Sequence, residues 1–332
     1  MKRPSKSDSP QFIVTGGAGF IGSNLVKALN ERGHENIIVV DHLNHPAKTR
    51  NLERLRFSDY YDKVTFRTML QEDMIPKVDC LFHIGACSST LVSDEAYLTD
   101  NNYLYSVESC EWAARVGARF VYASSAATYG DGSLGYGDED DSVTRSLRPL
   151  NAYGRSKQMF DLWAMDQGLF DRIAGLKYFN VYGPGEDHKG EMRSMVHKAY
   201  GQIASDGVVR LFQSHRPDYR DGEQVRDFVY VADAVAVTLF FWDHPEVSGL
   251  YNCGTGRART WIDLAKALFA AVGKEPKVEF VPMPPQLRSS YQYHTRADMS
   301  KLRRAGFVAP FIDTEEGVAR YVREYLAAAP GV

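Results

Sequence analysis

The sequence is poor in cysteine, and its four cysteines are not spaced to bind metal or to build a disulfide framework. No pair has Cys-x-x-Cys spacing and each lies among apolar or small residues; they are Cys80, Cys87, Cys110 and Cys253. Reduced thiols in the protein core are therefore the default expectation. We predict no metal site and a cytoplasmic protein.

An excess of positive charge and long apolar runs are also missing. The 39 Lys and Arg are balanced by 42 Asp and Glu, which gives a formal net charge of -3. A nucleic-acid groove requires a clustered basic surplus, so we expect no nucleic-acid partner. The apolar runs are short and are interrupted by charge or glycine, so no membrane span is predicted.

The N-terminus lacks the apolar segment that a secretory signal requires. Its first ten residues, MKRPSKSDSP, are polar and rich in Pro and Ser. Because no apolar stretch follows the positive start, this segment does not have the pattern of a signal peptide. We predict a disordered extension over residues 1–10.

The rest of the chain alternates short apolar runs with helix-length segments. This alternation predicts an α/β fold, a Rossmann-type doubly wound parallel sheet covered by helices on both faces. The predicted strands lie at the start of 12–33 and at 36–41, 64–66, 80–86, 119–125 and 173–183. After residue 183 the loops lengthen and prolines cluster, which predicts a smaller, interleaved lobe. We expect a main domain over 11–183 with a strand and helix returning to its sheet at about 226–256, and a lobe made of 184–225 and 257–332.

Glycines follow the first predicted strand and precede a helix. In TGGAGFIG, Gly16, Gly19 and Gly22 serve a tight turn, close approach of a pyrophosphate and close packing of the helix on the strand. The helix start then offers free N–H groups to phosphates. Asp41 ends the next strand, where a carboxylate can accept from a ribose hydroxyl. The combination predicts a dinucleotide site.

The residues around Asp41 leave the choice between NAD and NADP open. The Asp41 carboxylate favours NAD, because it repels a 2′-phosphate. The following segment carries His42, Lys48, Arg50 and Arg54, and such a basic loop can hold a 2′-phosphate.

A serine at a strand end precedes a Tyr-x-x-x-Lys pair. Ser125 ends the run RFVYASS, and Tyr153 and Lys157 share one face of a predicted helix. An exposed tyrosine has a pKa near 10, too high for a base at neutral pH, and a nearby ammonium lowers it. The three residues predict oxidation of a carbinol, with Tyr153 taking the proton and a nicotinamide taking the hydride.

Several motifs together resemble one enzyme family. They are VTGGAGFIGSN, GACSST, DNNY, YASSAATYG, FNVYGP, HKG, RDFVYV and GTGRA. The chain resembles the extended short-chain dehydrogenase/reductases and, within them, the ADP-L-glycero-D-manno-heptose 6-epimerase family, from about Gln11 to the C-terminal region. The resemblance implies one NADP per subunit, preferred over NAD, and a homo-oligomer, pentameric in the family.

The resemblance also assigns binding residues. It implies that the cofactor contacts Phe20, Ile21, Asp41, His42, Lys48, Lys63, Ile84, Gly85, Ala86, Cys87, Ser88, Asn101, Lys157, Val181 and Lys189. It implies that the ADP-heptose substrate contacts Ser125, Asn180, Glu191, Lys198, Phe212, Arg226 and Tyr291.

The family reaction gives a role to the loop GPGEDHKGEM. Inversion at C6 of the heptose removes a hydride from one face and returns it to the other through a 6-keto sugar, for the supply of lipopolysaccharide core heptose. The oxygen then occupies two positions, so one acid/base is not enough. The resemblance implies that Tyr153 serves one position and Lys189 the other.

Three alternatives compete with this reaction. A 4,6-dehydratase usually carries an Asp-Glu pair after the catalytic hydroxyl residue, whereas Ser125 is followed by AATYG. A UDP-hexose 4-epimerase shares Ser125, Tyr153 and Lys157 but needs no second base. A cofactor-bound protein without catalysis is disfavoured by the intact Ser125, Tyr153 and Lys157.

Overall fold

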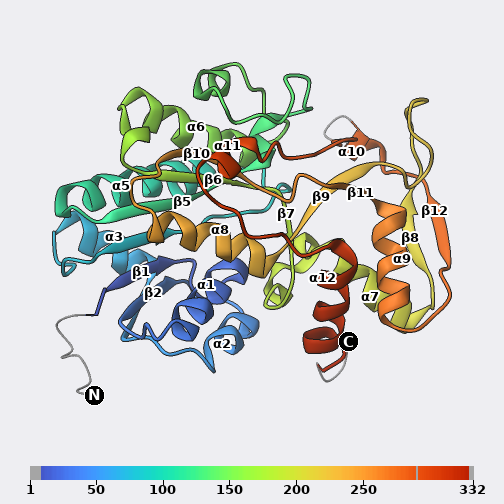
Figure 1. Ribbon diagram of the computed structural model, residues 1–332, viewed down its shortest axis with the longest axis horizontal. Helices are drawn as coiled ribbons and strands as arrows, with labels where there is room; N and C mark the ends of the chain where they lie inside the picture. The colour runs from blue at the N-terminus through green and yellow to red at the C-terminus, as the bar shows by residue number, and fades with distance from the viewer. Residues whose placement is uncertain (1–8, 289–290, 329–332) are drawn as a thin grey trace.

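The computed structural model describes residues 9–288 and 291–328, so most of the predicted N-terminal extension lies outside the described residues. The main sheet has seven strands, all paired in parallel, in the order β10-β6-β5-β4-β1-β2-β3 (Figure 1). The predicted Rossmann-type sheet is confirmed. Its strands are β1 (Phe12–Thr15), β2 (Ile37–Asp41), β3 (Asp59–Asp62), β4 (Cys80–His83), β5 (Arg119–Ser125), β6 (Ala174–Tyr178) and β10 (Gly249–Cys253).

The two faces of the sheet are buried in separate apolar cores. Along β1, Phe12 and Val14 belong to one core and Ile13 to the other, because successive side chains of a strand point to opposite faces. Helices α1 (Phe20–Glu31) and α8 (Val231–Asp243) contribute to the first core. Helices α3 (Lys63–Gln71), α5 (Tyr105–Val116) and α6 (Ala152–Asp166) contribute to the second.

The strand predicted at 64–66 is wrong. These residues lie inside helix α3, and the neighbouring strand β3 ends at Asp62. The Asp62 side chain accepts from the Val64 N–H at 2.9 Å, which starts the helix there. Phe66 and Leu70, four residues apart, are then buried on one helical face. This packing overrides the strand preference of the β-branched residues.

The segment predicted as one strand over 173–183 divides at Phe179. Strand β6 ends at Tyr178, and β7 (Asn180–Tyr182) leaves the main sheet. It pairs with β9 (Val225–Tyr230), which also pairs with β11 (Ala258–Thr260). The prediction that the strand at the start of 226–256 returns to the main sheet is therefore wrong, because β9 lies in this second sheet and β10 occupies the edge beside β6.

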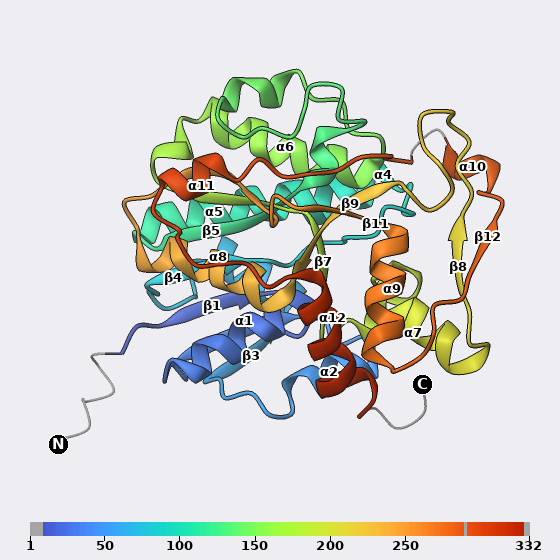
Figure 2. The same ribbon diagram turned by 45° about the vertical axis from the view of Figure 1, so that its right-hand side comes forward.

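The smaller lobe stands beside the carboxyl ends of the main strands (Figure 2). Its two-stranded parallel sheet pairs β8 (Val209–Phe212) with β12 (Val278–Val281). Its main helices are α7 (Met195–Ser205), α9 (Trp261–Ala271) and α12 (Thr314–Tyr321). The remaining helical segments are α2 (Pro46–Leu52), α4 (Glu95–Leu98), η1 (Thr99–Leu104), η2 (Ala126–Tyr129), η3 (Asp141–Arg145), η4 (Leu169–Asp171), η5 (Asp187–Met192), α10 (Pro285–Arg288), α11 (Ser300–Arg304) and η6 (Val322–Leu326).

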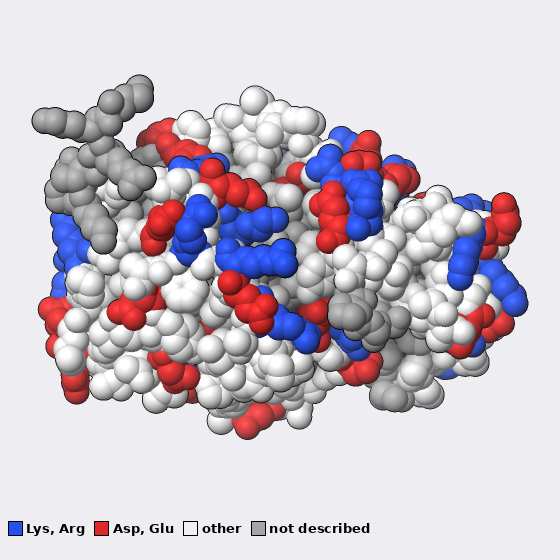
Figure 3. Space-filling model, turned by 90° about the horizontal axis from the view of Figure 1, so that it is seen from below, with Lys and Arg blue, Asp and Glu red and all other residues white. Residues whose placement is uncertain are grey.

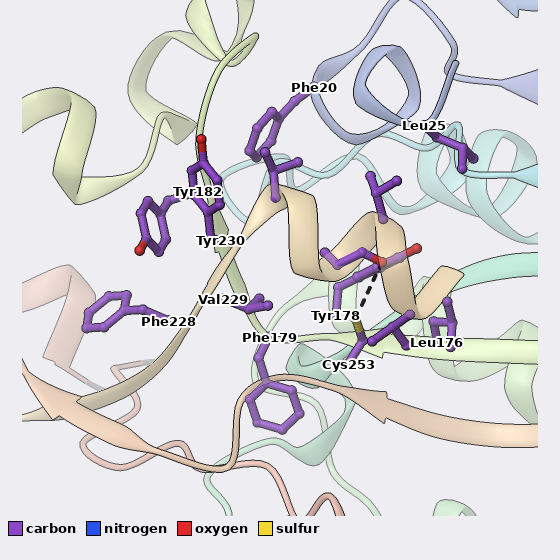
Figure 4. Close-up of a cluster of buried hydrophobic side chains, with 14 of the residues drawn as sticks. Phe20, Leu25, Leu176, Tyr178, Phe179, Tyr182, Phe228, Val229, Tyr230 and Cys253 are labelled. Atoms are coloured by element: carbon purple, nitrogen blue, oxygen red, sulfur yellow. Dashed lines mark hydrogen bonds between the residues drawn. The ribbon is translucent and has the colours of Figure 1, made fainter. Parts of the chain in front are cut away.

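A continuous apolar cluster joins the lobe to the main sheet. Tyr178, Phe179 and Tyr182 follow the chain from β6 into β7, and they pack with Phe228 and Tyr230 of β9 (Figure 4). The rings of Tyr182 and Tyr230 lie 5.6 Å apart. The two parts therefore share one core, which holds the ends of β6 and β7 in place.

Charged side chains of both signs are mixed over the face that carries α1, α2 and α12 (Figure 3). Basic side chains gather near the middle of this face, with acidic ones beside them. Within residues 9–288 and 291–328, no helix combines the length and the apolar character that crossing a membrane requires.

Candidate active site

A cavity of about 990 Å³ lies at the carboxyl ends of the main strands and extends under the smaller lobe. It follows the point where the strand order reverses between β1 and β4, which is where ligands bind in open α/β sheets. Every residue that the sequence assigned to a site lines this cavity, except Arg226. Of the basic residues offered for a 2′-phosphate, Arg50 and Arg54 do not line it either. The fold thus brings together residues from Gly16 to Tyr291.

The glycine-rich turn forms a cradle that larger residues would fill. A Cβ on Gly16 would lie 2.7 Å from the Gly85 Cα, and one on Gly22 would lie 2.1 Å from the Gly16 carbonyl oxygen. Gly16 also has a φ of +67°, which favours glycine. Gly19 caps helix α1, and no side chain of the described residues accepts from its first amides. A close backbone and free amides fit the pyrophosphate of a dinucleotide.

The Asp41 carboxylate already accepts three hydrogen bonds at the far end of this cradle. It accepts from the Ala18 N–H at 3.0 Å, from the His42 N–H at 2.7 Å and from the Lys48 Nζ at 2.8 Å. Lys63 Nζ donates to Asn101 Oδ1 at 2.6 Å. The negative charge that was expected to oppose a 2′-phosphate is therefore compensated by Lys48.

His42 lies at this end of the cavity, and its imidazole ring is paired with Asp62. The His42 Nδ1 lies 2.9 Å from the Asp62 Oδ2, at the start of helix α3. His42 still lines the cavity, with its imidazole held by Asp62.

Two further residues line the cavity without a role assigned from the sequence: Tyr105, and His188 of the HKG motif. Tyr105 is 2% exposed, and its hydroxyl has no hydrogen-bond partner among the described residues. The His188 Nδ1 is buried and has no hydrogen-bond partner among the described residues. A Cβ placed on Gly19 would lie 3.9 Å from the His188 Nε2. Burial and the charge of Lys48 lower the pKa of His188 to about 4. Both residues line the cavity, but these unpaired polar atoms are themselves buried.

Strand β5 and helix α6 bring Ser125, Tyr153 and Lys157 together. Ser125 is the last residue of β5 and is 8% exposed. The Asn151 side chain accepts from the Gly154 N–H at 2.8 Å and starts α6, so the predicted helix is confirmed. Tyr153 and Lys157 lie on successive turns of one helical face. All three line the cavity.

Burial dominates the acidity of the Tyr-Lys pair. It raises the pKa of Tyr153, and the hydrogen bond with Ser125, rather than the charge of Lys157, opposes this rise. Burial lowers the pKa of Lys157 to about 8, and the Asp161 charge acts against that shift. The sequence predicted that Lys157 lowers the pKa of Tyr153, whereas in the protein alone Tyr153 holds its proton at neutral pH.

A buried charge network lies behind this pair. Asp161, one turn after Lys157, is fully buried and accepts from the Tyr122 hydroxyl at 2.9 Å and from Ser124 Oγ at 2.7 Å. Its Oδ2 lies 3.6 Å from the Lys177 Nζ on β6. The network connects α6 to β5 and β6, and it fixes the helix face that carries the pair.

Lys189 reaches the same cavity from the loop after β7. It lies on η5, and its Nζ stands 5.4 Å from the centre of the Phe20 ring at the start of α1. Lys189 makes no ion pair with the described residues, and burial lowers its pKa. A lysine with these properties can exchange a proton with a ligand in the cavity.

The outer end of the cavity is built by aromatic residues around Arg226. The Arg226 guanidinium lies 5.4 Å from the Trp261 ring and 5.1 Å from the Tyr291 ring. Trp261 Nε1 donates to the Tyr291 hydroxyl at 2.9 Å, and both rings line the cavity. Arg226 is 7% exposed and lies one layer behind them. Trp261 was not singled out from the sequence.

The other predicted substrate residues line the same cavity. Asn180 and Phe212 line the cavity, and so do Glu191 and Lys198. The Lys198 Nζ lies 3.7 Å from the Glu191 Oε2, with the carboxylate largely exposed. The cavity therefore offers a mixed polar and aromatic surface next to the Tyr153 and Lys189 side chains.

Comparisons with known proteins agree with this geometry. Residues 12–254 match the family model of the NAD dependent epimerase/dehydratase family. A curated protein of Nitratidesulfovibrio vulgaris (strain DP4), named ADP-L-glycero-D-manno-heptose-6-epimerase, is 54% identical over 319 residues, 96% of this chain and 98% of the relative.

Solved structures show the same architecture. The ADP-L-glycero-D-manno-heptose-6-epimerase of Helicobacter pylori has a TM-score of 0.79 and 26% identity, over 99% of this chain and all of the other. The UDP-glucose 4-epimerase of Thermus thermophilus, solved in complex with NAD, has a TM-score of 0.76 and 27% identity, over 96% of this chain and 100% of the other.

Proposed function

Because the chain belongs to the NAD dependent epimerase/dehydratase family, and within it to the ADP-L-glycero-D-manno-heptose-6-epimerases, we propose that it inverts C6 of ADP-D-glycero-D-manno-heptose. The product is ADP-L-glycero-D-manno-heptose, formed through a 6-keto intermediate. The observation that carries the proposal is the meeting of Tyr153 and Lys189, from different segments, in one cavity with the glycine-rich turn.

Tyr153 acts as the first acid/base. Its hydroxyl, hydrogen-bonded to Ser125, takes the proton of the C6 hydroxyl while Ser125 orients that hydroxyl. When bound, a nicotinamide would supply the hydride acceptor and donor for C6, and its positive charge would favour the phenolate. Lys157, on the same helix face, holds the nicotinamide ribose and supplies a positive charge close to Tyr153.

Lys189 acts as the second acid/base. After the 6-keto sugar has turned, its oxygen points away from Tyr153, and a different group must deliver the proton. The lowered pKa of Lys189 favours this donation, because a lysine with the ordinary value releases its proton less readily. A UDP-hexose 4-epimerase has no need for such a second group.

We propose NADP as the cofactor, with NAD as the alternative. Lys48 compensates the Asp41 charge, and Lys63 lies at the same end of the cavity. Gly16, Gly19, Phe20, Ile21 and Gly22 would hold the pyrophosphate, and Ile84, Gly85, Ala86, Cys87, Ser88, Asn101 and Val181 would line its path to the nicotinamide. Identification of the nucleotide released by denaturing the purified protein decides between NADP and NAD.

The substrate would enter from the smaller lobe. We propose that Asn180, Glu191 and Lys198 contact the sugar and diphosphate, and that Phe212, Arg226 and Tyr291 form the nucleotide end. Arg226 would act from behind the Trp261 and Tyr291 rings, because it does not itself line the cavity. We also propose a cytoplasmic homo-oligomer, a pentamer as in the family, that supplies heptose for lipopolysaccharide.

The function is tested by incubating the purified protein with ADP-D-glycero-D-manno-heptose and resolving the C6 epimers by chromatography. We expect a mixture of both epimers, no net consumption of added NADPH, and no deuterium at C6 when the reaction runs in D2O, because the hydride stays on the cofactor. Turnover of UDP-glucose with no turnover of the ADP-heptose would contradict the proposal and favour the 4-epimerase alternative.

A further inference from the structure

Lys189 lies on a segment that has little internal support. Its short helix η5 spans Asp187–Met192 and is broken at Gly190, which has φ +53° and ψ -124°. A Cβ on Gly190 would meet no atom within 4 Å, so no packed neighbour restrains this residue. The position of the lysine must therefore be set by contacts made by the residues around it.

Glu186, three residues before Lys189, is the most buried of these residues. It is fully buried, and its carboxylate accepts from the N–H and the Oγ of Ser194, the residue that caps helix α7. The same carboxylate accepts from the Tyr321 hydroxyl of α12 at 3.0 Å. Glu186 thus ties the start of the loop to its end and to the C-terminal helix.

Asp187 repeats this arrangement one residue later. It accepts from the Tyr325 hydroxyl at 2.8 Å and lies 2.9 Å from the His197 Nε2. Tyr321 and Tyr325 lie on successive turns at the C-terminal end of the chain, and their rings are 5.8 Å apart. Two adjacent carboxylates are therefore held by two stacked turns of the same helical segment.

Two amides hold the other side of the loop to the glycine-rich turn. Asn24 Nδ2 donates to the Pro184 carbonyl at 2.9 Å and to the Phe20 carbonyl at 2.8 Å. Asn51 Nδ2 donates to the Gly185 carbonyl at 3.0 Å and to the Ala18 carbonyl at 3.1 Å. The loop is thus fixed between the cofactor cradle and the C-terminal helix.

We propose that Glu186 and Tyr321 are positioning residues that hold Lys189 in place for proton transfer, so that the C-terminal helix is part of the catalytic apparatus. This inference rests on the proposed function, because it assumes that Lys189 exchanges the proton. Neither residue lines the cavity, so both act through the loop.

Glu186 has a second effect on Lys189 through its charge. Burial lowers the pKa of Lys189, and the Glu186 carboxylate opposes that shift. Among the described residues, His188 also interacts electrostatically with Lys189. The Phe20 ring of α1 lies on the side of the Lys189 ammonium that faces this helix. Removing the Glu186 charge therefore lowers the pKa of Lys189 further.

Two variants separate the charge of Glu186 from its hydrogen bonds. Glu186→Gln keeps the volume and loses the charge, and we expect kcat for epimerisation to fall at least tenfold while KM and bound cofactor stay at the parental values. The alkaline limb of the kcat-pH profile should move to lower pH. Tyr321→Phe keeps the charge and removes one hydrogen bond, and we expect a fall in kcat of about fivefold with the alkaline limb unmoved.

The control is Glu316→Gln on α12, which removes a surface ion pair with Arg320 and leaves the loop contacts intact. It should retain the parental kcat and pH profile. The inference is overturned, and the proposed function is kept, by one combination of results. The parent epimerises and Lys189→Met does not, but Glu186→Gln and Tyr321→Phe keep the parental kcat and pH profile. Loss of bound cofactor in Tyr321→Phe would overturn it as well. A parent that fails to epimerise the ADP-heptose contradicts the proposed function instead.

Discussion

The two proposed acid/base residues are supported in different ways. Tyr153 stands on a regular helix that begins at an Asn151 cap and is joined to β5 and β6 through Asp161. Lys189 stands on an irregular loop that depends on Glu186 and on a helix more than a hundred residues away. The comparison teaches that one site is preorganised by local structure, whereas the other is assembled only when the whole chain has folded.

The largest effect is expected at the helical site. Tyr153→Phe removes one hydroxyl and leaves the helix intact, so turnover should fall by about 10³- to 10⁴-fold while bound cofactor and the melting temperature stay near the parental values. Epimer ratios by chromatography measure the turnover. Tyr61→Phe, whose hydroxyl donates to Asp59 at the surface, is the matched control. Near-normal turnover of Tyr153→Phe would show that Tyr153 is not an acid/base of the reaction.

The next effect is expected at the loop site. Lys189→Met should fold normally and retain cofactor but lose turnover by about 10²- to 10³-fold, because a positioned proton donor is lost. The fall should appear in kcat more than in KM. Lys266→Met, on the exposed face of α9, controls for the loss of a surface charge. A Lys189→Met variant with the parental rate would leave Tyr153 as the sole proton carrier.

The pH profile sharpens the role of the second residue on the helix. Burial lowers the pKa of Lys157 to about 8, so its ammonium is lost as the pH rises through that value. The ammonium that would hold the nicotinamide ribose then disappears, and kcat/KM should fall on the alkaline side of about pH 8. In Lys157→Arg the charge persists, so the alkaline limb should move to higher pH at a reduced maximum rate. An unmoved limb would assign it to another group, with Lys189 the first candidate.

The smallest effect is expected at the adenosine end. Lys48→Ala removes a cation and frees the Asp41 charge, and both changes disfavour a 2′-phosphate. The ratio of NADP to NAD affinity should fall about tenfold, as measured by calorimetry on protein stripped of nucleotide. Lys27→Ala, in an exposed pair with Glu31 on α1, is the control. An unchanged ratio would show that neither Lys48 nor its pairing with Asp41 contributes to recognition of a 2′-phosphate.

Sequence patterns predicted most of the main sheet because its signals are local. Buried parallel strands are short apolar runs, and the Tyr153-Lys157 spacing matches one helical turn. The predictions were wrong where hydrogen-bond partners decide the secondary structure or the strand pairing. Residues 64–66 follow an Asp62 cap into a helix, and β9 pairs with β7 because β6 ends at Tyr178 and β10 takes the sheet edge.

The site residues also fall into two groups, those marked by local sequence patterns and those brought together by tertiary contacts. The sequence by itself determined the glycine-rich turn, Asp41 and the Ser125, Tyr153 and Lys157 set, since each depends on spacing along the chain. Only the tertiary structure decided that Arg226 lies one layer behind the cavity and that Tyr105 and His188 line it, each with a buried polar atom that is unpaired among the residues that the structure describes. The Glu186–Tyr321 contact belongs to the same group, because hydrogen bonds between segments far apart in the chain leave no periodic pattern in the sequence.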